Sequence, residues 1–198
     1  APGATAAESS SRFAAFNQIR AFDNGFKLIK AASDLRSSAI VTDAALSSVN
    51  PNLVTVFPNT SLGRQLKQVA LLIKASTDVN AGINMKRQIF FTQIGGFDTH
   101  SQQLVGQGNL LTQVSQAINA FFLATGELGL QDKVTLFTMS DFSRTMQPSG
   151  TGAPDVGSDH AWGNNHLIVG GAVQGHTLYG TYPNLAPGST DDTDGGTS

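Results

Sequence analysis

The 198-residue sequence contains no cysteine and unusually little charge. The absence of cysteine excludes a disulfide framework and any metal site built on thiolates. Charged residues make up 13% of the chain, which is about half of their usual share in globular domains. Lysine and arginine number 12 and aspartate and glutamate 14, for a net charge of −2. No basic excess therefore indicates a nucleic-acid partner, and any metal site must use oxygen and imidazole ligands.

Long apolar runs are also missing. No run reaches the roughly 18 apolar residues that indicate a membrane-spanning helix, so we expect no membrane span. The first residues, APGATAAESSS, lack the basic and apolar parts of a signal peptide. They fit either a mature end left after cleavage or an internal start, and we expect the chain to be part of a longer one. Its length allows one domain with a sizeable core.

Three stretches have the apolar spacing of amphipathic helices. In residues 10–29 apolar side chains recur every three or four positions, and Asp23-Asn24-Gly25 allows a break there. Pro58-Asn59-Thr60 offers a helix start. The chain is expected to be irregular before it, over residues 41–58, with a weak helix near residues 43–49. The stripe that follows this start consists of Leu62, Leu66, Val69, Ala70 and Ile73. The stripe expected in a helix over residues 107–126 consists of Leu110, Val114, Ile118, Phe121 and Phe122.

Residues 87–94 and 133–139 are short, apolar and rich in β-formers, which predicts two buried strands. Because a helix separates them, they form a βαβ unit, which favours a parallel sheet. Two more short strands are expected over residues 166–173 and 176–182. The fold class is therefore α/β, a parallel-sheet core with flanking helices. The domain plan is a mainly helical segment 1–82, an α/β core with site loops 83–185, and a flexible tail 186–198.

Carboxylates and histidines follow both predicted strands. Asp98 and His100 come directly after the first strand, behind a glycine pair that lets the backbone turn, and Asp141 comes directly after the second. Ligand sites in open parallel sheets lie beyond the carboxyl ends of the strands, so we expect these residues to converge. His160 and His166 lie on or beside the long loop 140–165. The candidate metal ligands are thus Asp98, His100, Asp141, His160 and His166, for a divalent metal of unknown identity.

Simpler interpretations stay open for several of these residues. Asp141 alone is as well explained as a helix cap or turn former, and Asp159-His160 alone as a surface turn. Arg144 could form an ion pair with Asp141 or hold an anionic substrate. His176, beside a predicted strand, is taken as structural.

Three segments carry a family resemblance: IFFTQIGGFDTHSQQ, TMSDFSRT and GSDHAWGNNHLIVGGAVQGHTLYGTYP. They resemble the DUF1501 family of exported bacterial proteins, over roughly residues 60–185. That family is more distantly similar to the alkaline phosphatase and sulfatase superfamily. The resemblance implies an alkaline-phosphatase-like fold, a periplasmic or extracellular location, and a two-metal site that hydrolyses phosphate or sulfate esters. Asp98 and His100 would bind one metal, Asp141 the other, and His160 or His166 would add the remaining imidazole, with Asp159 a weaker candidate.

The chain departs from the superfamily pattern at two points. Phe142 stands where the superfamily has a histidine, and no counterpart of its upstream nucleophile is present. The first hypothesis is an exported metal-dependent hydrolase-like protein in which Arg144 is catalytic and holds a small anionic substrate. The alternatives are a non-catalytic exported binding or assembly protein that retains the hydrolase-like fold, and a domain in which the metal only stabilises the long loop.

Overall fold

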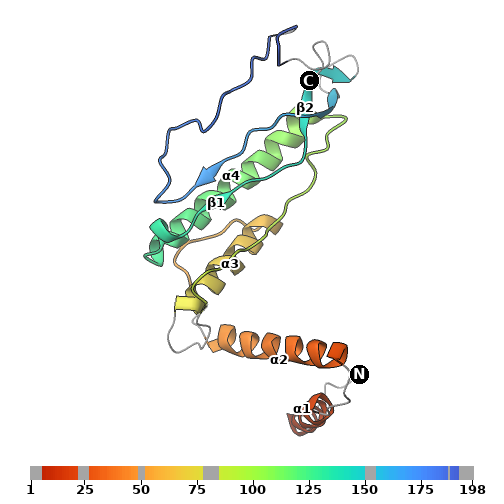
Figure 1. Cartoon of the computed structure of the whole chain (residues 1–198), viewed down its shortest axis with the longest axis vertical. Helices are drawn as coiled ribbons and strands as arrows, with labels where there is room; N and C mark the ends of the chain where they lie inside the picture. Colours follow the sequence, from red (N-terminus) through yellow and green to blue (C-terminus); the bar gives the residue numbers. More distant parts are fainter. Residues whose placement is uncertain are drawn as a thin grey trace.

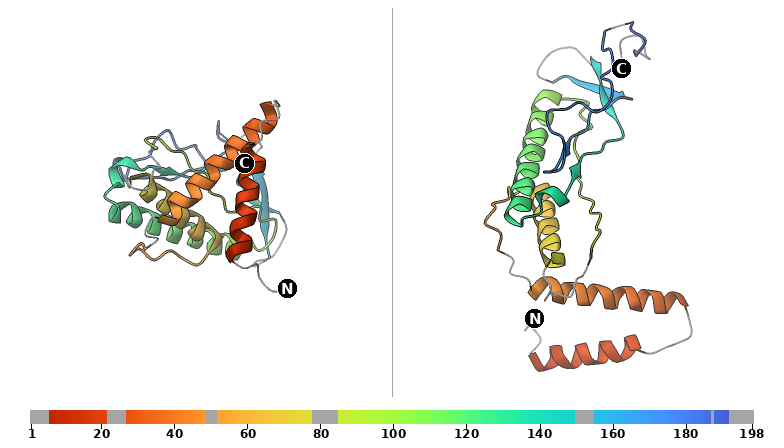
Figure 2. Two further views of the ribbon diagram at one scale, coloured as in Figure 1. Left: turned by 90° about the horizontal axis from the view of Figure 1, so that it is seen from below. Right: turned by 60° about the vertical axis from the view of Figure 1, so that its left-hand side comes forward.

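The computed structural model describes residues 6–21, 27–48, 52–77, 85–149, 155–186 and 188–191. Its helices are α1 (Ala6–Ala21), α2 (Lys27–Ser48), α3 (Ser61–Thr77), α4 (Gln103–Glu127) and the short 3-10 helix η1 (Gln131–Lys133). Its strands are β1 (Leu136–Phe137), β2 (Ser143–Ser149), β3 (Gly157–Ala161) and β4 (Ile168–Val169). Helices α3 and α4 lie side by side, α1 and α2 lie beyond one end of them, and β2 and β3 lie at the other end (Figures 1 and 2).

The predicted helices before and after residue 60 are present. The Thr60 hydroxyl accepts a hydrogen bond from the backbone N–H of Gly63 at 3.1 Å, which caps α3 as its sequence predicts. Helix α2 continues to Ser48, so it includes the weak helix expected near residues 43–49 and joins it to the residues before it. The predicted break at 23–25 and the end of the tail, residues 192–198, lie outside the described residues.

The hydrophobic core lies between α3 and α4. Its buried cluster consists of Leu62, Leu66, Val69, Ala70, Ile73, Ala117, Phe121 and Ala124. These residues include the whole predicted stripe of α3. On α4 the burial is centred on Phe121, while Phe122 and Leu110 are only half-buried.

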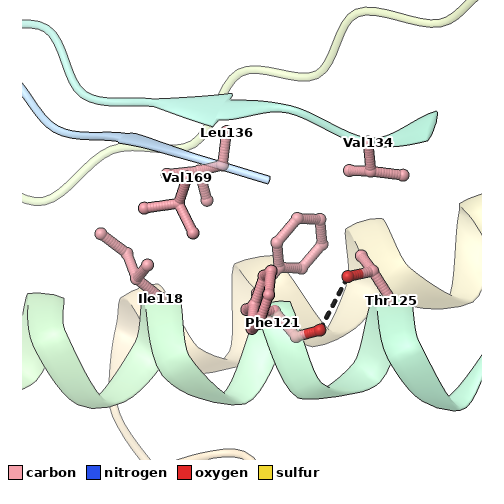
Figure 3. Close-up of a pocket in the computed structure, with 7 residues that line it drawn as sticks. Ile118, Phe121, Thr125, Val134, Leu136 and Val169 are labelled. Atoms are coloured by element: carbon pink, nitrogen blue, oxygen red, sulfur yellow. Dashed lines mark hydrogen bonds between the residues drawn. The ribbon is translucent and has the colours of Figure 1, made fainter. Parts of the chain in front are cut away.

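Extended segments cover α4 on another side. Ile118, Phe121 and Thr125 of α4 face Val134, Leu136 and Val169 around a cavity of about 10 Å³ (Figure 3). A space of that size holds at most about one water molecule. This cavity is therefore a packing void in the core and leaves no room for a ligand.

The predicted parallel-sheet core with flanking helices is wrong. Within the described ranges the strands form two separate antiparallel pairs, β1 with β4 and β2 with β3. The strands expected over residues 133–139 and 166–173 shrink to two residues each, and residues 176–182 form no strand. The long loop 140–165, in contrast, contains β2 and β3. An alkaline-phosphatase-like fold is not what this chain adopts.

Residues 87–94 show why a short apolar run led to a wrong strand prediction. No neighbouring strand pairs with them in the described structure. The side-chain amide of Gln65 on α3 makes the hydrogen bonds that a neighbouring strand would make. Its Oε1 accepts from the Gln93 N–H at 3.0 Å, and its Nε2 donates to the Gln93 carbonyl at 2.9 Å. Ile89 and Phe91 are 99% and 85% exposed, unlike a strand buried on both faces. A short apolar run therefore does not identify its partners.

No helix among the described residues is long and apolar enough to cross a membrane. This agrees with the lack of long apolar runs in the sequence.

Glu127, at the end of α4, holds the segment that leads into α3. Its carboxylate accepts hydrogen bonds from the backbone N–H groups of Val54 at 2.7 Å and Thr55 at 2.9 Å, and from the Thr55 hydroxyl at 2.8 Å. These donors favour the ionised carboxylate, so the bond from the Val54 N–H, followed by those from Thr55, holds the pKa of Glu127 below its usual range.

We expect Glu127→Gln to lower stability at pH 7, because the amide offers one acceptor oxygen instead of two. The folded pKa is lowered, so the carboxylate's contribution is fully present above the ordinary glutamate pKa of about 4.3. It is lost as the pH falls through the folded value. Urea unfolding at pH 7 and pH 3 should therefore show a difference between wild type and variant that shrinks in acid. An equal difference at both pH values would contradict this role for the charge.

Candidate metal-binding site

The backbone brings the segment before α4 against β3. The N–H groups of Gln102 and Gln103 donate to the carbonyls of Asp155 at 3.2 Å and Val156 at 3.1 Å, and Ser158 N–H donates to the Thr99 carbonyl at 3.3 Å. A side-chain Cβ at Gly157 would overlap the backbone carbonyl of His100. Glycine at this position therefore permits the close approach that places residues 98–100 beside β3.

Asp98 is the centre of the site. Its Oδ1 lies 2.8 Å from Nε2 of His160 and 2.9 Å from Nε2 of His100. Nη1 of Arg144 donates to the same oxygen at 2.6 Å. The hydrogen bond from His160, and next the one from Arg144, hold the pKa of Asp98 below its usual range, so the group is a carboxylate at neutral pH.

Arg144 is largely enclosed, with its side chain only 9% exposed. Its Nη2 donates to the backbone carbonyl of Ser158, and its guanidinium lies over the ring of Phe142, 5.8 Å from the centroid. Its Nε is buried without a hydrogen-bond partner in the part of the chain that the structure describes. The ion-pair partner is Asp98, not Asp141 as one sequence interpretation allowed, so Arg144 links β2, β3 and the segment before α4.

The two imidazoles are held in different ways. Nδ1 of His100 lies 3.2 Å from Oδ1 of Asp159, while the ring of His160 stacks on Phe142, with centroids 4.4 Å apart and planes at 25°. The two imidazole centroids are 5.5 Å apart. The register of the strands explains part of this arrangement, because Arg144 on β2 pairs directly with His160 on β3.

The donor atoms suit a metal ion. One carboxylate oxygen of Asp98 and one nitrogen each of His100 and His160 all lie within 4.8 Å of one another. Metal–ligand bonds are about 2 Å long, so two ligands of one ion lie at most about 4 Å apart, and this spacing is close to what one ion requires. An oxygen and two imidazole nitrogens suit zinc and other first-row divalent metals. The set fits a metal ion on the chemistry of its donors as well as on their spacing.

The structure assembles part of the predicted ligand set. Asp98, His100 and His160 form the group, and among the described residues neither Asp141 nor His166 belongs to it. Gly96 has φ of +99°, the left-handed conformation that the predicted glycine turn before Asp98 requires.

Two features of the site were missed by the sequence reasoning. One is the link from Arg144 to Asp98, which no local spacing indicates. The other is Gly157. A glycine directly before Ser158-Asp159-His160 is compatible with a close approach of another backbone segment at this point.

A groove of about 430 Å³ adjoins the site between the first half of α4 and the β2–β3 pair. It is lined on α4 by Gln103, Leu104, Gln107 and Leu111, and on the strand side by Thr145, Met146, Val156 and Ser158. Ser158 belongs to both features, because its hydroxyl donates to Gln103 at 2.6 Å and its carbonyl accepts from Arg144.

Comparison with known proteins gives one match. No curated protein and no solved structure matches the chain. The profile of the family described as protein of unknown function, DUF1501, matches residues 81–193. This range covers more than half of the chain and contains Asp98, His100, Arg144, Asp159 and His160. The chain therefore belongs to the DUF1501 family.

Proposed function

We propose that this protein is a metal-dependent hydrolase of phosphate or sulfate esters. The observation that carries the proposal is the convergence of Asp98 Oδ1, His100 Nε2 and His160 Nε2 within 4.8 Å, from segments far apart in the sequence. The choice of reaction rests on the more distant similarity of the DUF1501 family to the alkaline phosphatase and sulfatase superfamily. Export to the periplasm or the extracellular space is part of the same proposal and rests on the resemblance to the DUF1501 family.

The residues of the site would have separate roles in metal binding and in substrate binding. Asp98, His100 and His160 would hold the ion, which when bound supplies a Lewis acid and a clamp for negative charge. Arg144 places a fixed positive charge against Asp98, which would hold that carboxylate and add positive charge beside an anionic phosphate or sulfate group. The groove beside Ser158 offers room for the organic part of an ester.

The test measures metal binding and ester hydrolysis in the same protein. Purified protein is dialysed against zinc, manganese or calcium, its metal content is measured, and hydrolysis of p-nitrophenyl phosphate and p-nitrophenyl sulfate is followed. We expect a single bound divalent ion per chain and hydrolysis of one of the two esters that stops after chelation. Asp98→Ala should weaken metal binding by more than about 100-fold, since it removes a ligand and not merely an outer partner.

The control is Asp132→Ala, which removes an exposed carboxylate from η1 and should leave metal content unchanged. Wild-type protein that binds no divalent ion would overturn the proposal.

A second candidate function is a non-catalytic metal-binding module. The side chains of Asp98, His100 and His160 are 53%, 53% and 55% exposed, which is open for a site that must exclude water from a reaction. In that case the ion would only stabilise the contact between β3 and the segment before α4. Stoichiometric metal binding without hydrolysis of either ester would favour this candidate.

A further inference from the structure

Asp159 contacts the site from outside the ligand group. Its Oδ1 lies 3.2 Å from Nδ1 of His100, whereas it is Nε2 of His100 that faces Asp98. The two contacts therefore lie on opposite edges of one imidazole ring. Asp159 does not belong to the group of donor atoms that lie within 4.8 Å of one another.

This placement determines what Asp159 can do. A neutral imidazole carries its proton on one nitrogen, and the group bonded to that nitrogen selects the tautomer. A carboxylate 3.2 Å from Nδ1 of His100 favours the tautomer with its proton on that nitrogen, which leaves the Nε2 lone pair for an ion shared with Asp98. Partners of this kind orient the ring and raise its basicity as a ligand.

The backbone keeps Asp159 in place for this contact. Its N–H donates to the Thr145 hydroxyl at 3.1 Å, which ties β3 to β2 at this residue. His160 is held by the ring of Phe142, so the contact with Asp159 distinguishes one imidazole from the other. An exposed Asp–His pair adds little stability of its own, so removal of the Asp159 carboxylate should affect the site rather than the fold.

We propose that Asp159 is a positioning residue of the metal site, which fixes the tautomer and orientation of His100 through Nδ1 and does not itself bind the ion. This inference rests on the metal site proposed above. It reassigns Asp159, which the motif resemblance left as a weak ligand candidate.

The test uses Co²⁺, whose visible absorption reports the number and type of its ligands, together with Zn²⁺ competition for affinity. Asp159→Ala should weaken Co²⁺ binding by about 10- to 100-fold, while the shape of the absorption spectrum stays that of the wild type. Asp159→Asn keeps an acceptor oxygen for Nδ1–H and should recover most of the lost affinity. Far-UV circular dichroism verifies that each variant is folded.

Asp155→Ala is the matched control, because Asp155 lies at the start of the same strand segment and its carboxylate contacts Gln102, at 3.4 Å, and not a histidine. It should bind Co²⁺ like the wild type. Unchanged affinity in Asp159→Ala, or the same loss in Asp155→Ala, would overturn the positioning role while leaving the metal site intact. An altered Co²⁺ spectrum in Asp159→Ala would show that Asp159 is a ligand instead. Failure of the wild type to bind Co²⁺ or Zn²⁺ would overturn both the metal site and this role.

Discussion

Replacing Phe121 by alanine is expected to lower the free energy of unfolding by about 3–5 kcal/mol. Phe121 is 5% exposed and belongs to the cluster that joins α4 to Leu66, Val69 and Ala70 of α3. Truncation removes the transfer free energy of the ring and leaves a cavity, because helix backbones relax only partly. Since single domains are stable by about 5–15 kcal/mol, this loss is a large fraction of the total. Urea unfolding followed by circular dichroism measures it.

The control removes the same ring from a surface position. Phe137 lies in β1 and is 61% exposed, so Phe137→Ala should cost less than about 1 kcal/mol. A similar loss in both variants would mean that the α3–α4 interface is not the core of the molecule. The denaturant slope must stay unchanged for the comparison to hold, because a changed slope indicates a different denatured state.

The helices were predictable because their signal is local. Leu62, Leu66, Val69 and Ile73 recur at helical spacing behind a Thr60 cap, and the structure buries all four of these side chains. On α4 the pattern predicted the helix and, with Ile118 and Phe121, part of its buried face, while Leu110 and Phe122 are only half-buried. Phe121 and Phe122 are adjacent, and only the packing against α3 decides that Phe121 points into the core.

The sheet was not predictable because strand pairing is not local. The runs 87–94 and 133–139 have the composition of buried strands, but composition does not say which backbone will accept their hydrogen bonds. In the structure the side chain of Gln65 bonds to Gln93, and Leu136 pairs antiparallel with Val169. The parallel βαβ unit was inferred from spacing alone, and spacing fixes neither partner nor direction.

The candidate site was partly predictable for a different reason. Asp98, His100 and His160 were chosen as metal ligands from their residue types and from where they lie relative to glycines and apolar runs. The structure brings them together through β2 and β3, in a stretch for which the sequence indicated only a loop. Asp141 was added on the assumption of a common sheet edge, and without a parallel sheet that edge does not exist.

The largest effect on the site itself is expected from His160→Ala. His160 lies on β3 and supplies one of the three donor atoms of the group. Its removal should weaken divalent-metal binding by more than about 100-fold, because loss of a residue that only contacts a ligand already costs about 10- to 100-fold. His176→Ala is the matched control, because His176 is an exposed histidine outside that group. It should bind metal like the wild type.

The same pair of variants tests whether the metal orders residues 155–166. A ligand present at 100 times its dissociation constant stabilises the bound state by about 2.7 kcal/mol, which reduces the opened population about 100-fold. Chymotrypsin, which needs no metal, should cleave after the exposed Trp162 at a rate proportional to the population in which this region is open, since opening and closing are fast relative to cleavage. Zinc should therefore slow cleavage by up to about 100-fold in the wild type and in His176→Ala, but not in His160→Ala. If chelation leaves the cleavage rate of the wild type unchanged, the metal has no part in ordering β3. The protein's own contacts, such as the backbone hydrogen bonds of Gln102, Gln103 and Ser158, then hold β3 against α4.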